Sequence, residues 1–181
     1  PEYPLSFPAT KYLGYPNVQS DNSDGWQPLR GLKVIDFSML LPGPLTTLIL
    51  ADLGAEVIKV EPPGGDYARH MKGYLFEGVN RNKSSIVVDL KAPEAQQIVE
   101  RLASYGDIAI EGFRPGVADR LGIGAQQLQA INPELVYCSL SGFGQTGPMR
   151  SKAGHDLAYI AMGGGLVHKG QLRRPPSRSA L

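Results

Sequence analysis

The sequence predicts a doubly wound α/β fold, in which a mainly parallel β-sheet carries helices on both faces. Short β-rich segments alternate with helical segments between residues 33 and 140. Several β-rich segments are nearly continuous in apolar residues, as is typical of strands buried on both faces. Alternation of this kind is typical of a sheet covered by helical layers.

The first strand-helix-strand unit is expected at the start of this region. Residues 33–37 are β-rich, and an apolar segment at 45–53 follows them. Pro44 at the beginning of this segment and Gly54 just past its end indicate a helix. Residues 56–61 are the second expected strand.

The next unit follows an irregular stretch at residues 62–84. Residues 85–89 read as a third strand, and residues 92–105 have the apolar spacing of an amphipathic helix. Gly106 ends this helix.

Strands and helical pieces continue to alternate after Gly106. Strands are expected at 107–111 and 134–140, separated by helical pieces at 117–121 and 125–131. A further helix is expected at 156–162.

The two ends of the chain lack apolar periodicity. Residues 1–30 are rich in proline and polar residues and predict an extended arm, while residues 31–166 predict one globular domain. Residues 167–181 are rich in arginine and proline and are expected to form a linker toward a further portion of the protein.

Composition excludes several classes of function. The 181 residues are 42% hydrophobic with a formal net charge of +1, so bulk charge predicts neither a nucleic acid nor a membrane partner. Cys138 is the single cysteine, and no Cys/His cluster has metal-ligand spacing. We therefore expect a soluble cytoplasmic protein without a bound metal.

Ligands of open parallel sheets bind at the carboxyl ends of the strands, so the loops there contain the candidate binding residues. The first loop, with Leu40, Leu41 and Pro42, allows close backbone approach at Gly43, although it also fits an ordinary turn. Positively charged residues and one aromatic residue follow the later strands. An arginine there could bind a phosphate with two parallel hydrogen bonds, although each charged residue could instead be a solvated surface residue. These later candidates are Lys91, Gly112, Phe113, Arg114 and Arg120.

His155 and Asp156 form a second kind of candidate site. Histidine titrates near neutrality, and a neighbouring carboxylate could orient it as a base toward a carbon acid. Asp156 could instead be a helix N-cap.

The segment from Gly142 to Gly147 matches G-x-G-x-x-G but predicts no dinucleotide site. Pro148 and polar residues follow it instead of a helix, and it comes after the fifth expected strand instead of the first.

An ordered set of motifs resembles the N-terminal half of the family III CoA-transferases, the CaiB/BaiF family. The resemblance covers about residues 28–166, and the family includes formyl-CoA transferases, carnitine CoA-transferases and 2-methylacyl-CoA racemases. The motifs are Gly31-Leu32-Lys33-Val34-Ile35-Asp36, Gly43-Pro44, the run from Leu50 to Pro63, Gly65-Asp66 with Arg69, the run from Asn80 to Ser85, Phe113-Arg114-Pro115-Gly116, Asn132-Pro133, and the run from Gly142 to Pro148.

The resemblance implies a Rossmann-like large domain that binds CoA, with the family's smaller domain absent from this chain. It implies an interlocked homodimer whose substrates are an acyl-CoA and a carboxylic acid, with no tightly bound cofactor. The CoA contacts that it implies are Leu40, Leu41, Pro42, Val88, Lys91, Gly112, Phe113 and Arg120. The first loop lacks the glutamine of formyl-CoA transferases, which argues against a formyl or oxalyl substrate.

The resemblance leaves two chemistries open at His155. In the racemases the histidine of Gly-His-Asp is the base at the carbon alpha to the thioester, whereas many transferases have tyrosine there. In the transferases the nucleophile is an aspartate of a later Gly-Asp motif. That motif is expected just after Leu181, so we expect an acyl-CoA enzyme that is incomplete and inactive as this chain alone. A non-catalytic CoA-binding or assembly fragment is the remaining alternative.

Overall fold

The computed structural model describes residues 26–165 of the chain. They belong to two compact units that meet in sequence between Leu140 and Ser141, and each unit is described by itself. Most of the expected arm and the whole expected linker at 167–181 lie outside the described residues.

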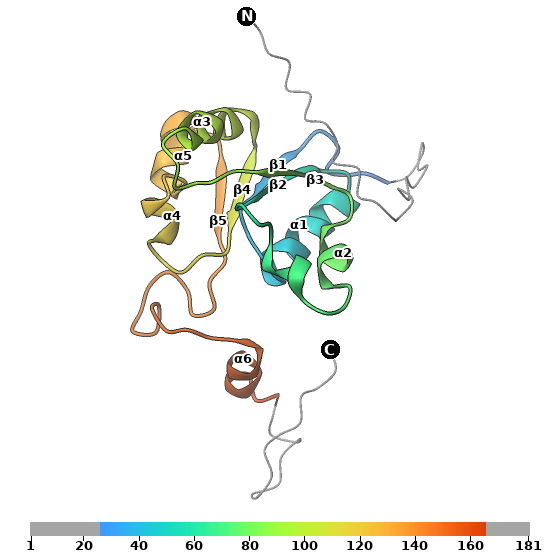
Figure 1. The fold of residues 1–181 in the computed structure, drawn as a ribbon, viewed down its shortest axis with the longest axis vertical. Helices are drawn as coiled ribbons and strands as arrows, with labels where there is room; N and C mark the ends of the chain where they lie inside the picture. Colours follow the sequence, from blue (N-terminus) through green and yellow to red (C-terminus); the bar gives the residue numbers. More distant parts are fainter. Residues whose placement is uncertain (1–25, 166–181) are drawn as a thin grey trace, which may run out of the picture. The chain divides into compact units, whose positions relative to one another are not determined.

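The first unit is built on a five-stranded sheet in which all neighbouring strands run parallel (Figure 1). The strand order is β3-β2-β1-β4-β5, so the chain moves outward from β1 in one direction and then in the other. This is the doubly wound topology that the sequence predicts. The strands are β1 (Lys33–Asp36), β2 (Glu56–Glu61), β3 (Lys83–Val87), β4 (Ile108–Glu111) and β5 (Val136–Ser139).

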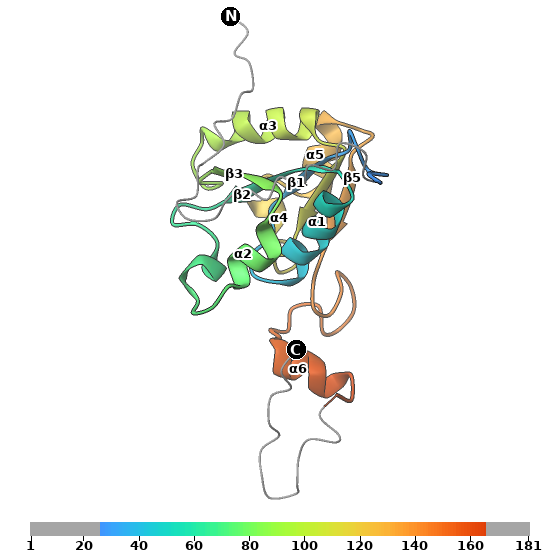
Figure 2. The same cartoon turned by 90° about the vertical axis from the view of Figure 1, so that its right-hand side faces the viewer.

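Helices cover both faces of this sheet, as expected. Helices α1 and α2 lie on one face, and α3, α4 and α5 lie on the other (Figures 1 and 2). Their bounds are α1 (Pro42–Asp52), α2 (Leu75–Asn80), α3 (Ala95–Tyr105), α4 (Val117–Arg120) and α5 (Ala125–Ile131), with a 3-10 turn, η1 (Tyr67–His70), before α2.

Alternating side chains of the strands form two separate cores. Ile35 packs in one cluster with Val99 of α3 and Leu128 of α5. Its neighbour Val34 packs in the other with Ala51 of α1. Because successive residues of a strand point to opposite faces, a strand covered on both sides must bury every residue.

The stretch at 62–84, expected to be irregular, contains both η1 and α2. Asp66 caps η1 by accepting the Ala68 N–H at 2.9 Å. Both elements are too short to produce a visible apolar period. The prediction was therefore wrong here.

Element boundaries also differ by a few residues. Helix α1 begins at Pro42, three residues before the expected start. Helix α3 begins at Ala95 instead of residue 92, because the Ala95 N–H closes a turn on the Ala92 carbonyl first. Strand β3 covers Lys83–Val87 instead of 85–89, because these five residues pair in register with Val57–Glu61 of β2.

The second unit contains one described helix, α6 (Asp156–Met162), at the expected residues. Within residues 26–165, no helix is long and apolar enough to cross a membrane.

Candidate functional site

The loops after β1 and β4 meet where the strand order reverses, which is the usual ligand site of this topology. A Cβ placed on Gly112, after β4, would lie 3.5 Å from Cβ of Ser38, after β1. A Cβ on Gly43 would lie only 2.1 Å from Ser38 Oγ, so glycine is required where α1 begins. The first loop is thus tightly packed between β4 and α1.

A cavity of about 150 Å³ opens at this carboxyl edge. It brings together Val88, Lys91 and Phe113, three of the residues predicted to bind CoA. Phe113 is half-buried and Lys91 is exposed. The full lining is Phe37, Met39, Val60, Glu61, Pro62, Val88, Asp89, Leu90, Lys91, Phe113 and Leu121. This predominantly apolar lining suits a flat ring with a cation at its rim.

The other predicted residues of this edge lie beside the cavity and do not line it. Leu40, Leu41 and Pro42 follow Met39 and are exposed. Arg114 and Arg120 are also exposed, and Arg120 Nη1 would lie 3.5 Å from a Cβ on Gly116.

Three of the strands end in a buried carboxylate that accepts an N–H from the loop following it, a feature that sequence reasoning missed. Asp36 ends β1 and accepts the Ser38 N–H at 2.9 Å. Glu61 ends β2 and accepts the Asp66 N–H at 2.9 Å. Glu111 ends β4 and accepts the Phe113 N–H at 2.7 Å. The carboxylates therefore shape the loops that form the candidate site.

Asp36 also anchors α1 through a buried cation. Thr47 Oγ1 donates to Asp36 Oδ2 at 2.6 Å, and Lys83 Nζ lies 3.3 Å from the same oxygen. Burial lowers the pKa of Lys83 to about 8, although the charge of Asp36 and its hydrogen bond act in the opposite direction. Lys83 Nζ additionally donates to the Pro44 carbonyl and the Asn80 side chain.

Lys59 and Asp66 form a second buried pair under the first loop. Lys59 Nζ is 2.9 Å from Asp66 Oδ2, and the two side chains are 1% and 0% exposed. Lys59 also donates to the Ser38 carbonyl at 2.8 Å, while Asp66 accepts the Leu40 N–H at 3.1 Å. The pair therefore contacts the first loop at two points.

Glu61 is paired with Arg69, whose Nε and Nη2 donate to its two oxygens at 2.6 Å each. Burial alone would raise the pKa of Glu61. Hydrogen bonds from Arg69, Ser85 and the Asp66 N–H, together with the charge of Arg69, outweigh burial and lower the pKa to about 2. Arg69 also stacks 3.6 Å above the Phe76 ring.

In the second unit, His155 is the N-cap residue of α6 and Asp156 is the first helical residue. The reading of Asp156 as N-cap is therefore wrong by one position. Both residues are exposed, and no hydrogen bond joins their side chains in the described part of the unit. The histidine is thus accessible without a fixed partner among these residues.

Gly142, the first glycine of the G-x-G-x-x-G match, packs against Tyr159, as does Gly154 beyond the match. A Cβ on Gly142 would lie 1.8 Å from the Tyr159 hydroxyl, and one on Gly154 would lie 2.5 Å from it. Phe143 packs on the same ring, with centroids 5.3 Å apart. Turns and not a helix follow this segment, so it lacks the helix that a dinucleotide fingerprint opens.

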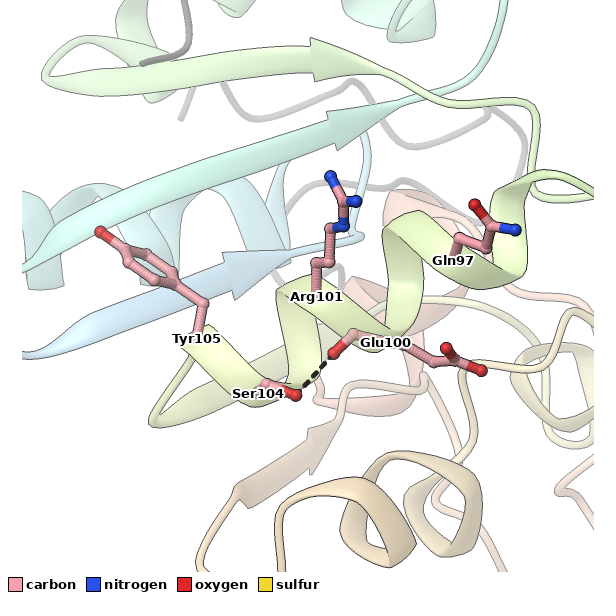
Figure 3. A pocket seen from close by; sticks show the side chains of 5 residues that line it. All are labelled: Gln97, Glu100, Arg101, Ser104 and Tyr105. Carbon is pink, nitrogen blue, oxygen red and sulfur yellow. Dashed lines mark hydrogen bonds between the residues drawn. The ribbon is translucent and has the colours of Figure 1, made fainter. Parts of the chain in front are cut away.

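A larger hollow of about 570 Å³ lies along α3, where Figure 3 shows its five lining side chains. All five come from one helix: Gln97, Glu100, Arg101, Ser104 and Tyr105. Tyr105 donates to Glu56 at the start of β2, so the hollow reaches the amino edge of the sheet. It lacks the converging strand ends of the smaller cavity.

Across residues 26–165, no group of three His, Cys, Asp or Glu residues could hold a metal ion.

Known proteins are similar in sequence to most of this chain. A family model described as CoA-transferase family III matches residues 29–181. The succinyl-CoA–D-citramalate CoA-transferase of Chloroflexus aurantiacus is 44% identical over 163 residues, which are 86% of this chain and 40% of that protein. The alpha-methylacyl-CoA racemase of Homo sapiens is 40% identical over 148 residues, 82% of this chain and 37% of that protein.

Solved structures share the fold as well. A CAIB/BAIF family protein from Brucella suis superposes with a TM-score of 0.80 at 39% identity, over 87% of this chain and 44% of that one. The chain spans about 40% of the length of the curated relatives.

Proposed function

The chain belongs to CoA-transferase family III, and from this premise we propose that it supplies the CoA-binding part of an enzyme that transfers CoA between an acyl-CoA and a carboxylic acid. The observation that carries the proposal is the cavity at the carboxyl edge, where loops from β1, β2, β3 and β4 converge. CoA is the substrate, and no tightly bound cofactor is part of the proposal.

Each residue predicted to bind CoA has a role in this proposal. The apolar cavity beside Val88 and Phe113 takes the adenine ring of CoA. Lys91, Arg114 and Arg120 meet the phosphates, since a cation bound to a phosphate makes a charge-assisted hydrogen bond. The exposed first loop, Leu40 to Pro42, and Gly112 lie along the rest of the carrier.

Arg120 offers the direct test of CoA binding. Arg120→Ala is expected to weaken CoA binding roughly 10- to 100-fold, because one charge-assisted hydrogen bond contributes about 1.5–3 kcal/mol. The measurement is calorimetric titration of the 181-residue chain with CoA. Arg101→Ala, which removes an exposed arginine of α3, is the matched control and should bind CoA as the unsubstituted chain does (Figure 3). No CoA binding by the unsubstituted chain, or equal binding by both variants, would contradict the proposal.

Racemisation of a 2-methylacyl-CoA is the second candidate function. It is favoured by the Gly-His-Asp motif, in which His155 and Asp156 are exposed, and by the identity with the human racemase. In this reaction His155 takes the proton from the carbon alpha to the thioester. Incorporation of deuterium at that carbon from deuterated water, lost in His155→Ala, would support it; CoA transfer without any such exchange would argue against it.

A homodimer in the cytoplasm completes the proposal. Leu41, the N-cap residue of α1, and Leu45 and Ile49 within the helix are exposed apolar residues spaced by four, which supports a protein partner on this helix. The molar mass in solution, measured by light scattering, should be twice that of one chain, and a monomeric mass would contradict the dimer.

A further inference from the structure

Leu40 has a backbone conformation that few residues with a side chain adopt. Its φ is 67°, in the left-handed region, where Cβ crowds the following carbonyl oxygen. The residue is 39% exposed, so core packing does not impose this conformation. Another interaction must hold the residue.

The Asp66 carboxylate supplies that interaction. Leu40 donates its N–H between the two oxygens of Asp66, at 3.1 and 3.2 Å. Asp66 is completely buried and is held by the ammonium of Lys59, by the Ala68 N–H and by its own N–H bond to Glu61. An acceptor fixed from so many sides can impose a conformation on its donor.

Lys59 adds a second restraint on the same loop. Its ammonium donates to the Ser38 carbonyl, two residues before Leu40, while it is paired with Asp66. The buried pair thus fixes the loop on both sides of Met39, a residue that lines the cavity.

We propose that Asp66 is a positioning residue: it holds Leu40 in the left-handed conformation that directs the first loop toward CoA. Asp66 itself does not touch the ligand. The proposal rests on the proposed function, because the loop is taken as a CoA contact.

The test compares Leu40→Ala with Leu40→Gly, each with and without Asp66→Asn. Both variants remove the Leu40 side chain, but only glycine adopts a φ near 67° without strain. If Asp66 imposes the conformation, Asp66→Asn should weaken CoA binding at least about 10-fold with alanine at position 40 and less than about 3-fold with glycine. Equal weakening in both backgrounds would overturn the proposal, since a general loss of stability does not depend on the residue at position 40.

Two further measurements test the proposal if the chain does not bind CoA or if the Asp66→Asn variants do not fold. The urea midpoints of the same four proteins should show the same inequality between alanine and glycine backgrounds. In the unsubstituted chain, the amide of Leu40 should exchange with solvent at least about 10-fold more slowly than a free peptide amide. Unprotected exchange would overturn the role of Asp66, whereas absent CoA binding with a protected amide would overturn only the proposed function.

Discussion

Lys59→Met is expected to lower the free energy of unfolding by about 3–5 kcal/mol, because it leaves the Asp66 carboxylate buried without its cation. The ammonium of Lys59 lies 2.9 Å from Asp66, and neither side chain reaches solvent. A carboxylate in such a place cannot regain water without opening the loop. Urea unfolding of the single variant measures the loss.

Two further variants show whether the lost charge pair causes this effect. Lys72→Met removes an exposed lysine and should change the free energy of unfolding by less than about 0.5 kcal/mol. Adding Asp66→Asn to Lys59→Met should recover part of the loss, because the uncompensated charge disappears. A loss below about 1 kcal/mol in Lys59→Met would show that the pair contributes little.

Acid should destabilise the protein through Glu61. The folded pKa of Glu61 is about 2, below its ordinary value of 4.5, so the unfolded chain binds a proton more readily between these values. Stability from this group is therefore complete above about pH 4.5 and is lost as the pH falls toward 2. The shift corresponds to about 3 kcal/mol.

Glu61→Gln isolates this contribution. The difference in unfolding free energy between the unsubstituted protein and Glu61→Gln should be about 3 kcal/mol at pH 7 and should approach zero near pH 2. Glu134→Gln, an exposed substitution, should follow the pH profile of the unsubstituted protein. A difference that stays constant from pH 7 to pH 2 would rule out Glu61 as the source.

The sheet was predictable because burial on both faces leaves a strong signal in the sequence. Apolar runs such as the one around Val57 and Ile58 predict a parallel strand covered on both faces, and the doubly wound sheet that these runs predict is confirmed. The strand order itself was not predicted. Short elements were not predictable. Helix α2 has only six residues, and its sequence shows no period that would distinguish it from a loop.

The sequence predicted part of the candidate site's lining, and its role in binding stays a prediction. Val88 and Lys91 follow β3 and Phe113 follows β4, and parallel strands bring their carboxyl ends to one edge, where all three residues line the cavity. The buried charges were missed, although Lys59 and Glu61 lie inside a strand expected to be covered on both faces, where a charge needs a partner. The identity of each partner depends on loop geometry that spacing does not reveal, as with Asp66 and Arg69.

The close approach of Gly43 to Ser38 limits which residues of the first loop can change. Since helix α1 starts directly against the end of β1, lengthening this loop or enlarging either residue would push the helix off the sheet. The exposed side chains of Leu40 and Leu41 can instead be exchanged while the backbone of the loop stays unchanged.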